Sequence, residues 1–296
     1  MVKKELINRF DSTALQDSFS ESAMAAACPK QFWRKPTYVE YIRDQNPFDG
    51  ITIFTDKQLH RVTEVSSTYK VAILQEPREL MPWIYQTITE FEDHYDLILT
   101  FDIDLIKRGK NYVFCPGDTA AIRTDGCIIH EKTKLISFAY SLKTQLFGHK
   151  LRHIIAKSVI PSLDLPYKID YYGAAVGNFV EDKLETLKDY MFQIATENVQ
   201  KEYYYTDKIL DCAITGTVPI YWGPKNIGNF FNPKGILQFN TPDDLKEILN
   251  NLNEDKYYEM LPYVKENYEA AKYYMIQDDF FYEIIKKGLE KNGKNT

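Results

Sequence analysis

Short apolar runs separated by turn residues and amphipathic stretches dominate the chain from residue 51 onward. Apolar runs bounded by Gly, Pro or Asp are typical of buried strands, and apolar residues three and four apart predict helices. In the first half this pattern predicts strands at 51–54, 71–74, 96–100 and 112–114, and a helix at 83–91. The stretch 1–46 is polar and weakly patterned, and we expect from it only one or two helical turns at 23–28.

The pattern restarts after residue 133. It predicts strands at 135–140, 168–172, 191–195 and 217–222, helices at 151–159, 183–190 and 206–215, and further helices throughout 241–292. Pro219 is unfavourable inside the last strand because proline lacks the N–H that a sheet needs. Continuous apolar strands that alternate with helices favour parallel sheets covered on both faces. We therefore predict an α/β fold of two Rossmann-like domains, 1–133 and 134–296, which face a central cleft; the final helices can pack back on the first domain.

Composition and charge narrow the classes of function. The 296 residues suit two domains, and 44 % hydrophobic and 26 % charged residues are ordinary for a globular protein. The net charge of −6 argues against nucleic acid as a partner. We find no signal-peptide pattern and no run of 18 apolar residues, so we expect a cytoplasmic protein with at most peripheral membrane contact. The four cysteines form no CxxC pair, which argues against a structural zinc site.

The richest segment for chemistry runs from Phe192 to Gly223. A strand ends at Ala195, a polar loop follows, and Thr206 can cap the next helix. Amides at such a helix start favour anions, and Lys208 adds a full positive charge for a diphosphate. Asp207 and Asn198 could hold ribose or sugar hydroxyls. The plain alternative is a capped helix with charges on its surface.

This segment resembles the nucleotide-sugar-binding motif of the family 10 glycosyltransferases, the α-1,3/1,4-fucosyltransferases. The matching positions are Phe192, Ile194, Ala195, Glu197, Asn198, Tyr204, Thr206, Lys208, Ile209, Asp211, Gly216, Pro219, Ile220, Tyr221, Trp222 and Gly223. Two positions depart: Asp207 stands where the family usually has Glu, and Cys212 where Ala is common. The resemblance is strong over 190–235, weaker over 135–190 and faint in the N-terminal half.

The resemblance implies a GT-B type fold that binds the acceptor N-terminally and GDP-fucose C-terminally, and that transfers fucose with inversion. It implies a phosphate-binding arginine, for which Arg152 is the candidate and Lys150 the second choice. Glu197, Asn198, Tyr204, Thr206, Asp207 and Lys208 would complete the site for the nucleotide sugar. The shorter carboxylate arm of Asp207 keeps a different nucleotide-sugar donor open as an alternative.

An inverting transferase needs a general base for the acceptor hydroxyl, and the family places a glutamate just after an early strand. Glu76, directly beyond the strand at 71–74, is our candidate; Glu79 and Asp102 lie nearby in the sequence. Glu76 could instead cap a turn or pair with Arg78.

We expect no metal ion and no cofactor. The D-x-D of Asp102 and Asp104 is short enough to arise by chance, and His149 and His153 fit a basic helix start better than a metal site. The expected acceptor is a glycan or a lipid-linked oligosaccharide. A non-catalytic module that binds glycans or nucleotides is the remaining alternative.

Overall fold

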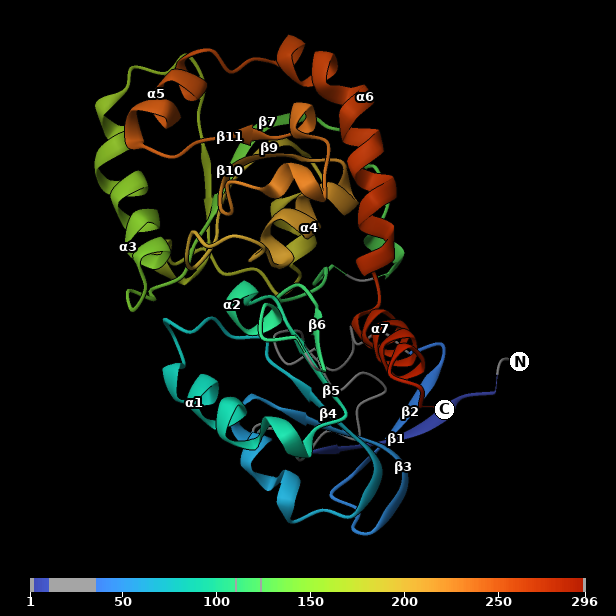
Figure 1. Ribbon diagram of the computed structural model, residues 1–296. Helices are drawn as coiled ribbons and strands as arrows, with labels where there is room; N and C mark the ends of the chain where they lie inside the picture. Colours follow the sequence, from blue (N-terminus) through green and yellow to red (C-terminus); the bar gives the residue numbers. More distant parts are fainter. Residues whose placement is uncertain (1–2, 11–35, 110, 123, 295–296) are drawn as a thin grey trace. The chain divides into compact units, whose positions relative to one another are not determined.

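The structure is a computed structural model that describes residues 3–10, 36–109, 111–122 and 124–294. The chain divides into two compact units (Figure 1). The first unit runs to Asp118 and takes in the C-terminal segment from Ile276, and the second unit runs from Thr119 to Met275. The sequence placed this division at 133/134, and the structure has it at 118/119 with the last helix in the first unit.

The first unit is built on a six-stranded, all-parallel sheet with the order β2-β1-β3-β4-β5-β6. Its strands are β1 (Glu5–Phe10), β2 (Val39–Arg43), β3 (Phe48–Thr55), β4 (Ser67–Ile73), β5 (Leu97–Thr100) and β6 (Tyr112–Phe114). Its helices are α1 (Pro82–Phe91), α2 (Ile103–Ile106) and α7 (Gln277–Lys291), with 3-10 turns η3 (Asp56–Thr63) and η4 (Glu92–His94).

Helices cover both faces of this first sheet. α1 begins with Pro82, whose fixed φ suits a first helical turn, and it buries Ile84, Tyr85 and Ile88 on one side. Figure 1 shows α7 on the opposite side of the sheet. A Cβ atom at Gly288 of α7 would lie 2.8 Å from the Leu97 side chain, so glycine permits the close approach of α7 to β5.

The prediction of weak order before residue 47 is wrong for the described part of that stretch, which contributes β1 and β2. β1 escapes a hydrophobicity pattern because it buries the polar residues Asn8 and Arg9. The Asn8 amide donates to the Thr52 hydroxyl (3.2 Å) and to the Gln45 carbonyl (2.9 Å), which satisfies it inside the sheet. The expected turns at 23–28 fall outside the described residues.

The second unit holds a five-stranded, all-parallel sheet with the order β11-β10-β9-β7-β8. Its strands are β7 (Lys134–Ala139), β8 (Asp170–Tyr172), β9 (Tyr190–Thr196), β10 (Val218–Trp222) and β11 (Leu237–Gln238). Its helices are α3 (Phe147–Ile154), α4 (Asp207–Thr215), α5 (Pro242–Asn250) and α6 (Glu254–Ala271). Single turns are η5 (Thr124–Gly126), η6 (Ile155–Val159, a π turn), η7 (Ile160–Ser162), η8 (Ala174–Val176), η9 (Lys183–Thr186), η10 (Ile227–Asn229), η11 (Pro233–Gly235) and η12 (Lys272–Tyr274).

Most predicted elements of the second unit are confirmed, and the helix at 183–190 is wrong. That stretch forms the single 3-10 turn η9, and the strand β9 begins as early as Tyr190. The apolar residues Leu184 and Leu187, whose spacing resembles that of a helix, belong to this turn, which is hydrogen-bonded to the sheet. Pro219 does lie in a strand, β10, where it pairs with β9. On the other side, β11 pairs with β10 only from Ile220 onward, so the proline lies outside that described pairing.

Candidate nucleotide-sugar site

The carboxyl end of β9 leads into a loop that a buried carboxylate holds in place. Glu197 has no exposed surface. One of its oxygens accepts from the Thr206 N–H (3.0 Å) and the Tyr221 hydroxyl (2.9 Å), and the other from the Thr206 hydroxyl (2.7 Å). Lys208 Nζ lies 3.4 Å from the second oxygen. The Glu197 carboxylate therefore ties the start of the loop to its end at Thr206, and it holds the loop in place.

Thr206 occupies the N-cap position of α4, but its hydroxyl does not cap the helix. The prediction of a Thr206 side-chain cap is wrong because the hydroxyl donates to Glu197 and accepts from Lys208 Nζ (2.8 Å). At the other end, α4 stops as predicted at Gly216, whose φ of 74° is left-handed.

The loop approaches the start of α3 at Gly148. The Gly148 N–H donates to the Asn198 carbonyl (3.0 Å), and a Cβ atom on Gly148 would lie 1.8 Å from the Glu197 carbonyl oxygen. No L side chain fits at that distance, so this glycine brings α3 and the loop together.

Arg152 lies on α3 and is the centre of this contact. It is in the second turn of the helix, which begins at Phe147 and not at residue 151 as predicted. Its guanidinium donates to the Thr196 hydroxyl (2.7 Å), to the Thr196 carbonyl and to the Asn198 side-chain oxygen (3.1 Å). Burial lowers the pKa of Arg152, while Glu197 and Asp207 favour its charge. Because an arginine stays protonated near pH 7, this places a buried positive charge at the end of β9.

The other predicted residues around Arg152 differ in accessibility. The Asn198 amide contacts the Tyr204 hydroxyl at 3.5 Å, and Tyr204 is buried. Lys150 is exposed on α3. His149 is buried, its Nδ1 accepts from the Leu146 N–H (3.3 Å), and burial together with Arg152 lowers its pKa to about 4. A neutral His149 that accepts from its own helix start is a structural group.

Two lysines and two carboxylates form a cluster at the first turns of α4, to which η9 contributes Lys183. Asp207 receives Lys183 Nζ on one oxygen (2.6 Å) and Lys208 Nζ on the other (3.2 Å). Burial opposes its charge, but Lys183 and Lys208 hold the pKa of Asp207 well below its usual range. Asp211, one turn later, contacts Lys183 Nζ at 2.5 Å and accepts from the Ala121 N–H (2.6 Å). Such a cluster, at a helix N-terminus and close to Arg152, can bind an anionic group.

The predicted base lies in the other unit. Glu76 follows the carboxyl end of β4, and the Tyr85 hydroxyl of α1 donates to its backbone carbonyl (2.9 Å). Arg78, the residue with which Glu76 could pair, contacts Asp102 at 3.2 Å and stacks over the Tyr85 ring at 4.3 Å. Asp102 caps α2 through the Asp104 and Leu105 N–H groups.

A second carboxylate lies beside Glu76. Asp56 follows the carboxyl end of the neighbouring strand β3 and accepts from the Gln75 N–H (3.2 Å). Its φ of 29° is unusual for a residue other than glycine. Burial raises the pKa of Asp56 to about 7, and the negative charge of Glu76 adds to the shift. Asp56 was not among the predicted site residues, although its position directly after a strand was a signal.

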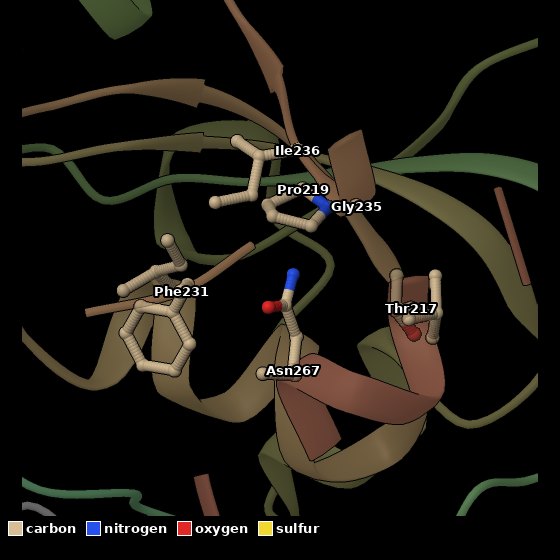
Figure 2. Close-up of a pocket in the computed structure, with 9 residues that line it drawn as sticks. Thr217, Pro219, Phe231, Gly235, Ile236 and Asn267 are labelled. Carbon is tan, nitrogen blue, oxygen red and sulfur yellow. The ribbon is translucent and has the colours of Figure 1, made fainter. Parts of the chain in front are cut away.

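The void enclosed between α4 and α6 in the second unit is too small for a nucleotide. An internal void among α4, β10, η11 and α6 measures about 10 Å³, room for about one water molecule (Figure 2). In Figure 2 the Asn267 side chain points into the space between Phe231 and Thr217. Among the described residues, no three His, Cys, Asp or Glu side chains are grouped to hold a metal ion. Within the same ranges, every helix is too short or too polar to cross a lipid bilayer.

Comparisons with known proteins bear directly on the second unit. The model of "Glycosyltransferase family 10 (fucosyltransferase) C-term" matches residues 130–286. The Alpha-(1,3)-fucosyltransferase FucT of Helicobacter pylori is 33 % identical over 115 residues, which is 37 % of this chain and 24 % of that protein. The chain thus aligns with about a quarter of this relative's length.

Solved structures extend the likeness to the whole fold. A crystal structure of an α1,3-fucosyltransferase with GDP matches with a TM-score of 0.58 at 17 % identity, over 98 % of this chain and 91 % of that one. A crystal structure of an α1,3-fucosyltransferase with GDP-fucose matches with a TM-score of 0.52 at 17 % identity, over 88 % and 82 %. The predicted GT-B type fold is confirmed by these likenesses. The family model covers more than half of the sequence, and the chain belongs to glycosyltransferase family 10.

Proposed function

We propose that this protein transfers L-fucose from GDP-fucose to a glycan hydroxyl, with inversion at the sugar carbon. The observation that carries the proposal is the cationic cluster of Arg152 and Lys208 at the end of β9 and the start of α4. It lies inside the segment that matches the family. A diphosphate is the part of a nucleotide sugar that such a cluster binds best.

Each residue of the cluster then has a role. Arg152 and Lys208 stabilise the negative charge that grows on the departing GDP. Asn198, Tyr204 and Asp207 orient the ribose and the sugar. Glu197 and Thr206 hold the loop in place beneath them, as their mutual hydrogen bonds suggest. Lys150 is the second choice for a phosphate contact because it is exposed on the same helix.

The chemical step is a single displacement. Glu76 takes the proton from the acceptor hydroxyl, and the acceptor oxygen forms a bond to the anomeric carbon. The bond between that carbon and the phosphate oxygen breaks, and its electron pair leaves with GDP. Attack opposite to the leaving group inverts the configuration. We assign the leaving-group stabilisation to protein cations rather than to a metal ion.

For the acceptor we propose a glycan, free or lipid-linked, that this protein would reach from solution or by peripheral contact with a membrane. The residues that select it would belong to the first unit, where the sequence resemblance is faint.

One observation favours a second candidate, the same reaction with another nucleotide sugar. Asp207 replaces the usual glutamate and has both oxygens bound to lysines. A shorter and fully engaged carboxylate would contact a different set of sugar hydroxyls. A module that binds without turnover is a third candidate.

Calorimetric titration of the protein with GDP and UDP, followed by GDP-fucose turnover with a panel of oligosaccharides, separates these candidates. We expect binding of GDP at least tenfold tighter than of UDP, and release of GDP only when an acceptor is present. Preference for UDP would overturn the assignment of GDP-fucose. Binding of GDP-fucose without release of GDP for any acceptor would favour the binding module.

A further inference from the structure

A lysine outside the matched motif organises the acidic side of the proposed site. Lys183 lies in the turn η9, before β9, and its ammonium group contacts two carboxylates of α4. The distances are 2.6 Å to Asp207 and 2.5 Å to Asp211. Although burial opposes its charge, these carboxylates raise the pKa of Lys183. The lysine is therefore a fixed positive charge beneath the first two turns of the helix.

The turn that carries Lys183 is anchored to the sheet. Asp182 caps it through the Leu184 N–H (2.9 Å). The Thr186 carbonyl accepts from the Ser137 hydroxyl of β7 (2.6 Å) and from the Gln193 amide of β9 (2.9 Å). Because both strands hold the turn, Lys183 is placed by the sheet and not by the helix it contacts.

Lys183 also decides how strongly Lys208 is held by its own neighbours. Asp207 shares its two oxygens between the two lysines, and Glu197 adds a third carboxylate near Lys208. Without Lys183, Asp207 would be neutralised by Lys208 alone. The positive charge offered to a diphosphate would then fall, although no residue that touches the ligand had changed.

The balance of charge points the same way. Arg152, Lys183 and Lys208 face Glu197, Asp207 and Asp211, so the formal charges of the six groups cancel. Loss of Lys183 would leave one negative charge in excess, at a site that must accept an anion. In a partly buried cluster such an imbalance is weakly screened by salt.

We infer that Lys183 is a positioning residue that sets the affinity of the site for the diphosphate of the nucleotide sugar, acting through Asp207 and Lys208. The inference rests on the proposed function, since it assumes that a nucleoside diphosphate binds at α4. It predicts a change in diphosphate affinity and in KM for the nucleotide sugar, with kcat altered less.

The test measures binding of GDP, UDP and inorganic pyrophosphate by calorimetry for the wild-type protein and four variants. We expect Lys183→Met to weaken binding of the preferred diphosphate about tenfold, and Lys183→Arg to retain it within about threefold. In the double variant Lys183→Met/Asp211→Asn the charges balance again, and the new amide oxygen can still accept from the Ala121 N–H. This variant should recover most of the lost affinity. Lys188→Met removes a lysine from the same segment and serves as the control for net charge.

The outcomes separate the two hypotheses. Wild-type affinity in Lys183→Met, or no recovery in the double variant, would overturn the role of Lys183 while the proposed function stands. If the wild-type protein binds none of the three diphosphates, both are overturned. If it prefers UDP, the identity of the nucleotide sugar changes, and the comparison among the variants still decides the role of Lys183.

Discussion

At the carboxyl edge of the first sheet, Asp56 lies beside Glu76, and its pKa is raised to about 7 by burial. At the corresponding edge of the second sheet, Asp207 is half-buried, and two lysines hold its pKa well below the usual range. Asp56 directly follows β3, whereas Asp207 begins α4, after the loop that leaves β9. The difference comes from what surrounds them: a second carboxylate and a single flanking lysine, Lys57, in one case, and Lys183 with Lys208 in the other.

This contrast matches two different chemical tasks. A carboxylate that is to accept a proton benefits from an environment that disfavours its charge. A site that is to hold a diphosphate needs its acidic groups compensated, so that the remaining cations can act on the ligand. Under the proposed function, one architecture, repeated twice, would provide a proton-accepting edge and an anion-binding edge. The following predictions test that assignment, from the largest expected effect to the smallest.

Glu76→Gln should abolish most of the transfer while sparing the anion-binding edge. We expect kcat to fall on the order of 10²- to 10⁴-fold, because the amide cannot take the acceptor proton. The affinity for GDP should stay within about twofold of wild type. Steady-state kinetics with GDP-fucose and calorimetry with GDP measure the two quantities.

Glu79→Gln is the matched control for Glu76→Gln, since Glu79 is exposed and only a few residues away. It should leave kcat nearly unchanged. A larger loss of kcat for Glu79→Gln than for Glu76→Gln would mean that Glu76 is not the base. If Glu76→Gln weakened GDP binding as much as it lowered kcat, the two edges would not have separate tasks.

Arg152→Ala should produce the opposite pattern. We expect GDP affinity and kcat to fall together, kcat by on the order of 10²-fold, because a buried guanidinium next to the leaving group is lost. Arg152→Lys keeps the charge but not the fork that holds Thr196 and Asn198, so its loss should be intermediate. Lys157→Ala, at an exposed position further along the same helical segment, is the control. If Lys150→Ala costs more than Arg152→Ala, the phosphate contact belongs to Lys150.

Gly148→Ala tests the contact that forms the second edge. The new methyl carbon would lie 1.8 Å from the Glu197 carbonyl, so α3 must move away from the loop. We expect a loss of about 1–3 kcal/mol in the free energy of unfolding, together with weaker GDP binding. Gly228→Ala, where the nearest atom lies 3.8 Å away, should cost far less in chemical denaturation. Equal costs would mean that the close contact of α3 with the loop is unimportant.

The sequence predicted the second unit better than the first for physical reasons. β9, α4 and β10 carry continuous apolar faces and a left-handed glycine, Gly216, that marks the helix end. β1 is hidden because Asn8 and Arg9 are buried and satisfied by partners far away in the sequence. The turn η9 has helical spacing over four residues only, too few to distinguish it from a helix.

The same limit applies to the candidate site. Residues that belong to one continuous motif, such as Asn198 and Lys208, were found because their spacing is visible along the chain. Lys183, Thr196 and Asp56 were missed because their roles depend on contacts across elements: η9 with α4, β9 with α3, and β3 with the segment after β4. Spacing along the chain carries no information about such contacts, which arise only when the sheet has formed.

The smallest predicted effect is the one that compares the two edges most directly, through the pH dependence of stability. The folded-state pKa of Asp56 is raised above its unfolded value, so the folded protein binds a proton more tightly and loses stability as the pH rises toward 7 and beyond. Asp207 has a lowered pKa, so its contribution is present above the unfolded pKa near 4 and constant from pH 5 to 8.

Between pH 5 and pH 8 the stability of Asp56→Asn relative to wild type should therefore increase, by on the order of 1 kcal/mol after allowance for access of water. The relative stability of Asp207→Asn should not change over that range. Urea denaturation of the three proteins at the two pH values measures both differences. A pH-independent difference for Asp56→Asn, or a pH-dependent one for Asp207→Asn, would remove the electrostatic distinction between the two edges.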